Sequence, residues 1–163
     1  RVLFRSLVEW MIKLAANKLD ELDNLAKGLN SSGHAIQARV YAEDPNKDFQ
    51  PSAGLLSEVD FPAKEHLRID HWLETGIEVP ALFDPMLAKV ITIADNRNDA
   101  IEQLSTALLE TTIYGIETNK VYVRELLITE IFIKGEIFSR YLNDFTFHTC
   151  NFDVITQRTS PII

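Results

Sequence analysis

Cysteine, basic charge and long apolar runs are all scarce in this chain of 163 residues. Its one cysteine, Cys150, has no partner for an internal disulfide, which favours a reducing environment. Lysine and arginine total 16 against 24 acidic residues and are scattered, which argues against a nucleic-acid groove. The apolar runs are far shorter than a membrane span, and no signal-type segment opens the sequence. We therefore expect a cytoplasmic protein that binds neither nucleic acid nor membranes.

The composition is that of a folded domain, with 46% hydrophobic residues and a formal net charge of −8. Two end segments are expected to lie outside it. Residues 1–6, RVLFRS, read like a translated sequencing adapter, and we expect a non-native leader. We expect the domain itself to cover residues 7–143. Residues 144–163 are expected to be a linker, or the start of a truncated following domain whose apolar residues lack a packing partner.

The first half of the chain predicts a helix and then a strand. Apolar residues recur at helical spacing over Leu7–Ala16, and Glu9 and Lys13 form an i,i+4 pair. Residues 17–32 have the mixed composition of a loose connector. Gly33–Ala42 alternates apolar and polar residues, which predicts a half-buried strand, and the Asp-Pro-Asn sequence after it predicts a turn.

Further strands are predicted at residues 55–59, 67–73, 86–93 and 112–114, and helices at 98–110 and around 121–127. The run at 86–93 is almost continuously apolar, which is typical of a strand buried on both faces. Asp95 or Asn96 is expected to cap the first helix, and Thr118 or Asn119 the second. Strands grouped before helices predict an α+β domain with a mainly antiparallel sheet and packed helices.

Several strings, in this order, carry a resemblance that no single one would establish: LVEWMIKLAA, GHAIQARVYAEDP, QPSAG, RID, DPMLAK, DNRNDA, YGIETN and RYLN. Together they resemble the C-terminal part of the biotin carboxylase domain of biotin-dependent carboxylases. Within that family the strings LVEWM, FQPSAGLLSEVDFP, RIDHWLETG and RYLN are most similar to urea carboxylase. Ala53, the segment Pro80–Phe83 and the segment Ile137–Ser139 depart from the usual family sequence.

The resemblance implies an ATP-dependent ligase that uses biotin, ATP and Mg²⁺ to make carboxybiotin from bicarbonate, here within an enzyme that makes allophanate from urea. It implies four partners: an upstream ATP-grasp part, a biotin carboxyl carrier domain, a carboxytransferase domain and, as one alternative, a second copy in a homodimer. The family's phosphate-binding and metal-binding residues fall before residue 7, so we expect the chain alone to be inactive. The alternatives are a biotin carboxylase subunit of an acyl-CoA carboxylase and a non-catalytic lid and dimerisation module.

Arg68 is the one catalytic residue that the resemblance places in this sequence. It matches the family arginine that contacts bicarbonate or carboxyphosphate and stabilises the biotin oxygen that becomes negatively charged. A guanidinium suits that role because it stays charged and offers a rigid fork of donors to planar oxyanions. From the residues alone, a strand arginine paired with Asp70 or Glu74 is the more frequent situation.

Two further residues are weaker candidates. The resemblance places Ser139 near the adenine of ATP, as a packing wall. Lys89 is a lone charge in an apolar strand, and we expect it to pair with Asp84 or with an acid on a neighbouring strand rather than to act in chemistry.

The histidines do not predict a metal site. His66 and His71 are five residues apart in a predicted strand and so face opposite sides. His148 and Cys150 alone supply two ligands near the end of the sequence, and we expect no metal held by this chain.

Overall fold

The computed structural model describes residues 2–18, 32–82 and 84–148. The chain divides into two compact units, Arg1–Ser32 and Gly33–Ile163. In the first unit, helix α1 covers Val2–Ala15 and therefore begins before the predicted start at Leu7. The expected ion pair between Glu9 and Lys13 is present. Most of the predicted connector, residues 19–31, lies outside the described residues.

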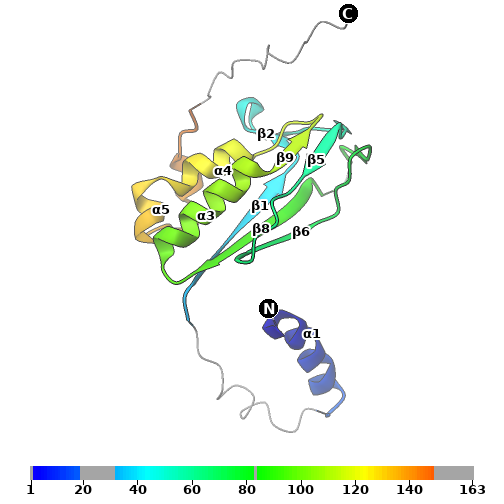
Figure 1. Cartoon of the computed structure of the whole chain (residues 1–163), viewed down its shortest axis with the longest axis vertical. Helices are drawn as coiled ribbons and strands as arrows, with labels where there is room; N and C mark the ends of the chain where they lie inside the picture. The colour runs from blue at the N-terminus through cyan, green and yellow to red at the C-terminus, as the bar shows by residue number, and fades with distance from the viewer. Residues whose placement is uncertain (1, 19–31, 83, 149–163) are drawn as a thin grey trace, which may run out of the picture. The chain divides into compact units, whose positions relative to one another are not determined.

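The second unit is built on a three-stranded antiparallel sheet with the strand order β1-β8-β6 (Figure 1). Strand β1 covers His34–Tyr41, β6 covers Leu67–His71 and β8 covers Met86–Ala94. The alternation in β1 is as predicted, because Ile36, Ala38 and Val40 are buried. The sheet therefore has one apolar face and one face that carries the intervening residues.

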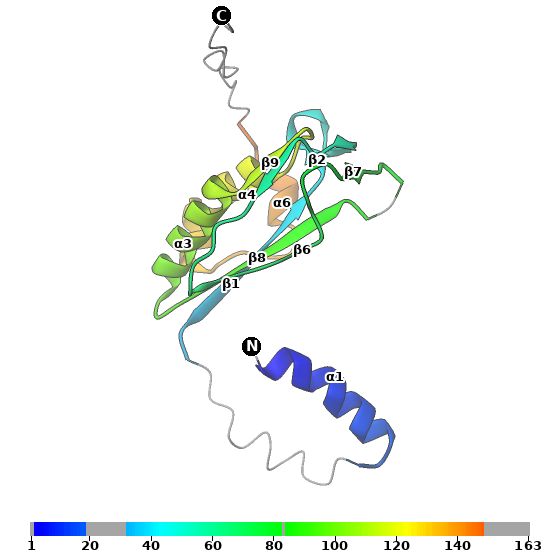
Figure 2. The ribbon, with the colours of Figure 1, turned by 45° about the vertical axis from the view of Figure 1, so that its right-hand side comes forward.

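Helix α3, Arg97–Glu110, covers the apolar face. The Asn96 side chain caps it by accepting a hydrogen bond from the Asp99 amide at 3.0 Å. On the sheet beneath, Thr92 donates its hydroxyl to the Ala100 carbonyl at 2.9 Å, and Val90 is fully buried. The core lies between this helix and the sheet, with α3 and α4 on one side of the strands in both views (Figures 1 and 2).

Shorter elements complete the unit. Three two-stranded pairs flank the main sheet, β2–β3, β4–β7 and β5–β9. The elements are β2 (Glu43–Asp44), η1 (Pro45–Lys47), β3 (Gln50–Pro51), β4 (Gly54–Leu55), β5 (Glu58–Asp60), β7 (Glu78–Val79), β9 (Thr112–Tyr114), α4 (Lys120–Leu127), α5 (Glu130–Lys134) and α6 (Tyr141–Asp144). Helices with a mainly antiparallel set of strands confirm the predicted α+β class.

Two strand predictions were wrong in part. The predicted strand at 55–59 is broken into β4 and β5, because Leu56 turns into the core and the Ser57 amide bonds to Tyr114. Strand β8 is central, but α3 covers only one of its faces. Ile93 is consequently 55% exposed, and Lys89 and Ile91 are half-buried. A continuous apolar run cannot show which face a helix will cover.

Asn119, one of the two residues expected to cap α4, occupies the N-cap position but does not act as a side-chain cap. At the start of α4 its side chain makes no cap hydrogen bond. Instead its Oδ1 accepts from the Tyr41 amide at 2.9 Å, and its Nδ2 donates to the Arg39 carbonyl at 3.2 Å. Asn119 is buried, and these bonds lie where the register between β1 and β8 shifts, between Val40 and Tyr41. One amide thus satisfies the backbone at an irregularity in the strand.

Replacing Asn119 with alanine should lower the free energy of unfolding by about 2–4 kcal/mol, because two partly buried backbone groups would lose their partners. Asn119→Asp keeps the acceptor for Tyr41 but cannot donate to Arg39, so it should fall between the wild type and the alanine variant. Urea denaturation of the three proteins at pH 7 measures this order. Equal stability of Asn119→Ala and the wild type would contradict the role assigned to the amide.

The segment after α6 packs in part against α4. Phe145 and Phe147 both contact the Tyr122 ring, with centroid distances of 5.4 and 5.5 Å. Phe49 contacts the same ring at 4.9 Å. Phe145 and Phe147 were expected to lack a packing partner, and both have one in Tyr122. Residues 149–163 lie outside the described part of the chain.

Candidate functional site

The face of the main sheet away from α3 carries polar side chains from all three strands, and we call it the polar face. The strand register sets Arg39 opposite Lys89, and Lys89 opposite Asp70. In the next row, Gln37 and Arg68 flank Ile91. Residues opposite one another in an antiparallel pair project to the same side. Three cations and one carboxylate therefore share this face, in a chain whose net charge is −8.

Arg68 and Asp70 form a two-pronged ion pair on β6. The distances are 3.0 Å from Arg68 Nε to Asp70 Oδ1 and 2.8 Å from Nη2 to Oδ2. Both side chains remain 38% exposed. The hydrogen bond that Arg68 donates to Asp70 raises the pKa of the Arg68 guanidinium above its ordinary value, so Arg68 stays charged. This is the pairing that the residues alone predicted for a strand arginine.

A pocket of about 220 Å³ adjoins the ion pair. Asp70 and Lys89 line it at the polar face, and Trp72 and Met86 contribute apolar surface. The indole nitrogen of Trp72 donates to the Met86 carbonyl at 3.0 Å, which joins β6 to the start of β8. The region combines a charged guanidinium, a second cation and an aromatic wall. Such a group of side chains can bind a small oxyanion with an attached apolar group.

Neither ion pair expected for Lys89 is among the ion pairs of the described residues, and the register shows only which acid lies across from it. Asp84 is occupied in its own turn, where Oδ1 accepts from the Met86 amide at 3.0 Å. Asp70, on the neighbouring strand, is the acid opposite Lys89. The lysine is therefore placed beside the carboxylate that Arg68 holds.

Ser139 lies apart from any regular element, in the exposed turn between α5 and α6. Next to it, the rings of Phe138 and Tyr141 contact each other, with centroids 6.0 Å apart. Within the described ranges, no three metal-ligating side chains gather in one place. No helix in those ranges is long and apolar enough to cross a membrane.

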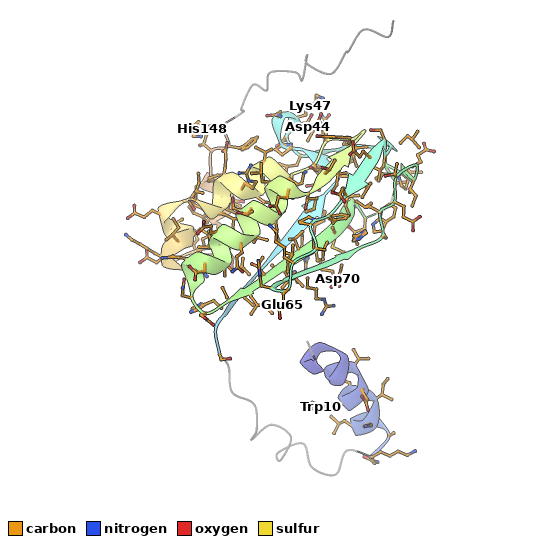
Figure 3. The ribbon with its side chains drawn as sticks, viewed as in Figure 1. Trp10, Asp44, Lys47, Glu65, Asp70 and His148 are labelled. Atoms are coloured by element: carbon orange, nitrogen blue, oxygen red, sulfur yellow. The ribbon has the colours of Figure 1, made fainter. Side chains whose placement is uncertain are left out.

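The turn after β1 is a second charged feature, at Asp44 and Lys47, well separated from Asp70 (Figure 3). Asp44 is buried, its Oδ1 accepts from the Asn46 amide at 2.9 Å, and its Oδ2 lies 3.0 Å from Lys47 Nζ. The hydrogen bond from Lys47 is the main reason why the pKa of Asp44 is lowered from its ordinary 3.8, and the Asn46 amide adds to the effect. The acidic motif after the strand therefore stabilises the turn and is separate from the ion pair on β6.

Because its pKa is lowered in the folded state, ionised Asp44 stabilises the fold above pH 3.8 and loses that effect as the pH falls through its folded pKa. Asp44→Asn keeps the acceptor for Asn46 but removes the charge. The stability difference between wild type and Asp44→Asn should thus shrink between pH 5 and pH 2. Asp44→Ala also loses the acceptor, which costs about 1 kcal/mol more. Denaturation curves at several pH values measure this, and a pH-independent difference would contradict it.

Comparison with known proteins places this geometry in a family. Residues 37–144 match the model of the biotin carboxylase C-terminal domain. Urea amidolyase of Lachancea kluyveri is 42% identical over 155 residues, which are 95% of this chain and 8% of that protein. The crystal structure of Kluyveromyces lactis urea carboxylase superposes with a TM-score of 0.77 at 42% identity, over 86% of this chain and 12% of that one. The human mitochondrial propionyl-CoA carboxylase alpha chain is 36% identical over 142 residues, covering 85% of this chain and 19% of that one.

The fold and these matches define the class as a domain of the biotin-dependent carboxylases. The chain belongs to the biotin carboxylase C-terminal domain family. Within it the chain is more similar to the urea amidolyase and urea carboxylase relatives than to the propionyl-CoA carboxylase relative. It spans about 8% of the length of the curated urea amidolyases that it matches.

Proposed function

We propose that this chain forms the C-terminal side of a biotin carboxylase site in a urea carboxylase. In the complete enzyme, an ATP-grasp part would bind ATP and Mg²⁺, and a carrier domain would bring biotin to the site. The carboxytransferase domain would then pass the carboxyl group to urea to give allophanate. The observation that supports this proposal is the placement of Arg68 on the polar face, in a family whose arginine at this position contacts the reacting oxyanion.

The side chains of the polar face fit the group that the family would bring there. Biotin supplies a ureido nitrogen that captures CO₂ and an adjacent oxygen that becomes negatively charged. The planar guanidinium of Arg68 would donate to that oxygen or to bicarbonate. Trp72 would provide an apolar wall beside it, and Ser139 would lie on the adenine side of the nucleotide.

Mg²⁺ and the triphosphate are assigned to the ATP-grasp part rather than to this chain. The purified chain should consequently cleave no ATP when it is incubated with Mg²⁺, bicarbonate and free biotin. Turnover clearly above the blank would contradict this division of the site.

Two hosts test the urea carboxylase assignment against the acyl-CoA carboxylase alternative. Residues 33–148 would replace the matching segment in Lachancea kluyveri urea amidolyase and, separately, in the human propionyl-CoA carboxylase alpha chain. The inserted segment must fit the rest of the host's site. The urea amidolyase chimaera should therefore keep a fraction of its parental rate that is at least several-fold larger than the fraction kept by the propionyl-CoA carboxylase chimaera. Better function in the propionyl-CoA carboxylase host would favour the alternative.

The non-catalytic alternative is a lid and dimerisation module. Its supporting observation is the ion pair between Arg68 and Asp70, since an arginine that only stabilises the strand would make the same contact. The loss of Arg68 distinguishes the two functions, because it should lower turnover only if Arg68 is catalytic. A homodimer is compatible with both functions.

A further inference from the structure

The ion pair with Asp70 restricts how Arg68 can bind an anion. Arg68 Nε and Nη2, on one edge of the guanidinium, both contact the Asp70 carboxylate. A planar oxyanion would use that same fork of parallel donors. For this edge to receive a substrate anion, Asp70 must first move away from Arg68, and a cation on the adjacent strand would stabilise its negative charge in the new position.

Lys89 is in the position to provide that cation. It lies directly opposite Asp70 in the register of β6 and β8, and cross-strand neighbours have Cβ atoms about 4.5–5.5 Å apart. Asp70 and Lys89 also line the same pocket. Arg39 lies opposite Lys89 on its other side and has the same charge. The two neighbouring positive charges would favour a carboxylate close to Lys89.

We propose that Lys89 is a positioning residue that takes over the ion pair with Asp70 when an oxyanion binds Arg68. Asp70 then alternates between two cations on adjacent strands, and the fork of Arg68 is released only when an anion replaces the carboxylate. No covalent bond changes in this exchange. The identity of the anion as bicarbonate rests on the proposed function, whereas the exchange itself does not. A lysine in the middle of an apolar strand is explained by this role.

The exchange can be observed in the full chain without catalysis. The NMR signal of the Arg68 Nε–H group reports the hydrogen bond to Asp70, and it should shift and saturate as sodium bicarbonate is added. Inorganic phosphate, titrated separately at matched ionic strength, distinguishes a planar from a tetrahedral oxyanion as the occupant. Lys89→Met should weaken the apparent affinity about fivefold, the effect of losing one exposed ion pair. Lys89→Arg should restore most of it.

Lys134→Met is the control, because it removes the charge of a different lysine, one that contacts Glu130 on α5. This variant should bind the anion as the wild type does. A loss equal to that of Lys89→Met would mean that general surface charge, and not the polar face, sets the affinity.

A double-mutant cycle decides whether Lys89 acts through Asp70. Asp70→Asn weakens the hold on Arg68, so in that background Lys89→Met should have little further effect. An equal fivefold loss in both backgrounds would show that Lys89 contacts the anion directly and would overturn the exchange. Absence of any anion-dependent shift at Arg68 in the wild type would overturn it as well. Failure of the host-exchange experiment, with these shifts intact, would reject the proposed function alone.

Discussion

Arg68→Ala should lower the rate of biotin carboxylation about 10²–10³-fold in the assembled enzyme, with little change in melting temperature. The loss in rate is expected because a preorganised donor to a developing negative charge would be missing. Stability should change little because Arg68 is half-exposed, and its ion pair with Asp70 is open to solvent. Arg68→Lys should recover only part of the rate, since it returns the charge without the fork.

Biotin-dependent release of ADP measures this effect in the urea amidolyase host that carries residues 33–148. Arg39→Ala is the comparison variant, because it removes a cation from the same face without touching the pair. Near parental turnover in Arg68→Ala would leave Arg68 as a surface strand residue and favour the lid and dimerisation module.

Gly115→Ala should destabilise the chain by about 4 kcal/mol or more. Gly115 follows β9 with a φ of +108°, and a Cβ atom there would overlap the Leu55 carbonyl oxygen and lie 3.1 Å from the Ser57 amide nitrogen. The backbone of β9 would have to separate from the segment that joins β4 to β5. The loss should be visible in urea denaturation followed by circular dichroism.

Gly76→Ala separates the two contributions to this effect. Gly76 also has a positive φ, +91°, but nothing lies within 4 Å of a Cβ built on it. It should therefore cost only the conformational strain, about 1–2 kcal/mol. Similar losses in the two variants would mean that the close approach at Gly115 is not important for stability.

The sequence predicted elements whose pattern is local. Strand β1 followed from its alternation, and Asn96 was one of two cap residues expected for α3. Arg68 could not be selected from its surroundings in the sequence, because a strand arginine near an acid is common. The resemblance to a family singled it out, and its role remains a prediction.

What the sequence did not show depends on contacts between distant residues. Asn119 bonds to backbone groups 78 and 80 positions earlier. An asparagine before a helix is equally well explained as a local cap, so the sequence does not indicate these distant bonds. The contact of Phe147 with Tyr122 likewise requires the fold to be known. The position of Lys89 opposite Asp70 became visible only with the register of β6 and β8.

The central claim is that this chain completes a biotin carboxylase site, and labelled bicarbonate tests it most directly. The urea amidolyase host carrying residues 33–148 would be incubated with ATP, Mg²⁺ and ¹⁴C-bicarbonate without urea, and label on its biotin would be counted. We expect label to accumulate at a rate within about tenfold of the parent, and to depend on ATP and on Arg68. A folded host that carries this segment and transfers no label to biotin would contradict the claim.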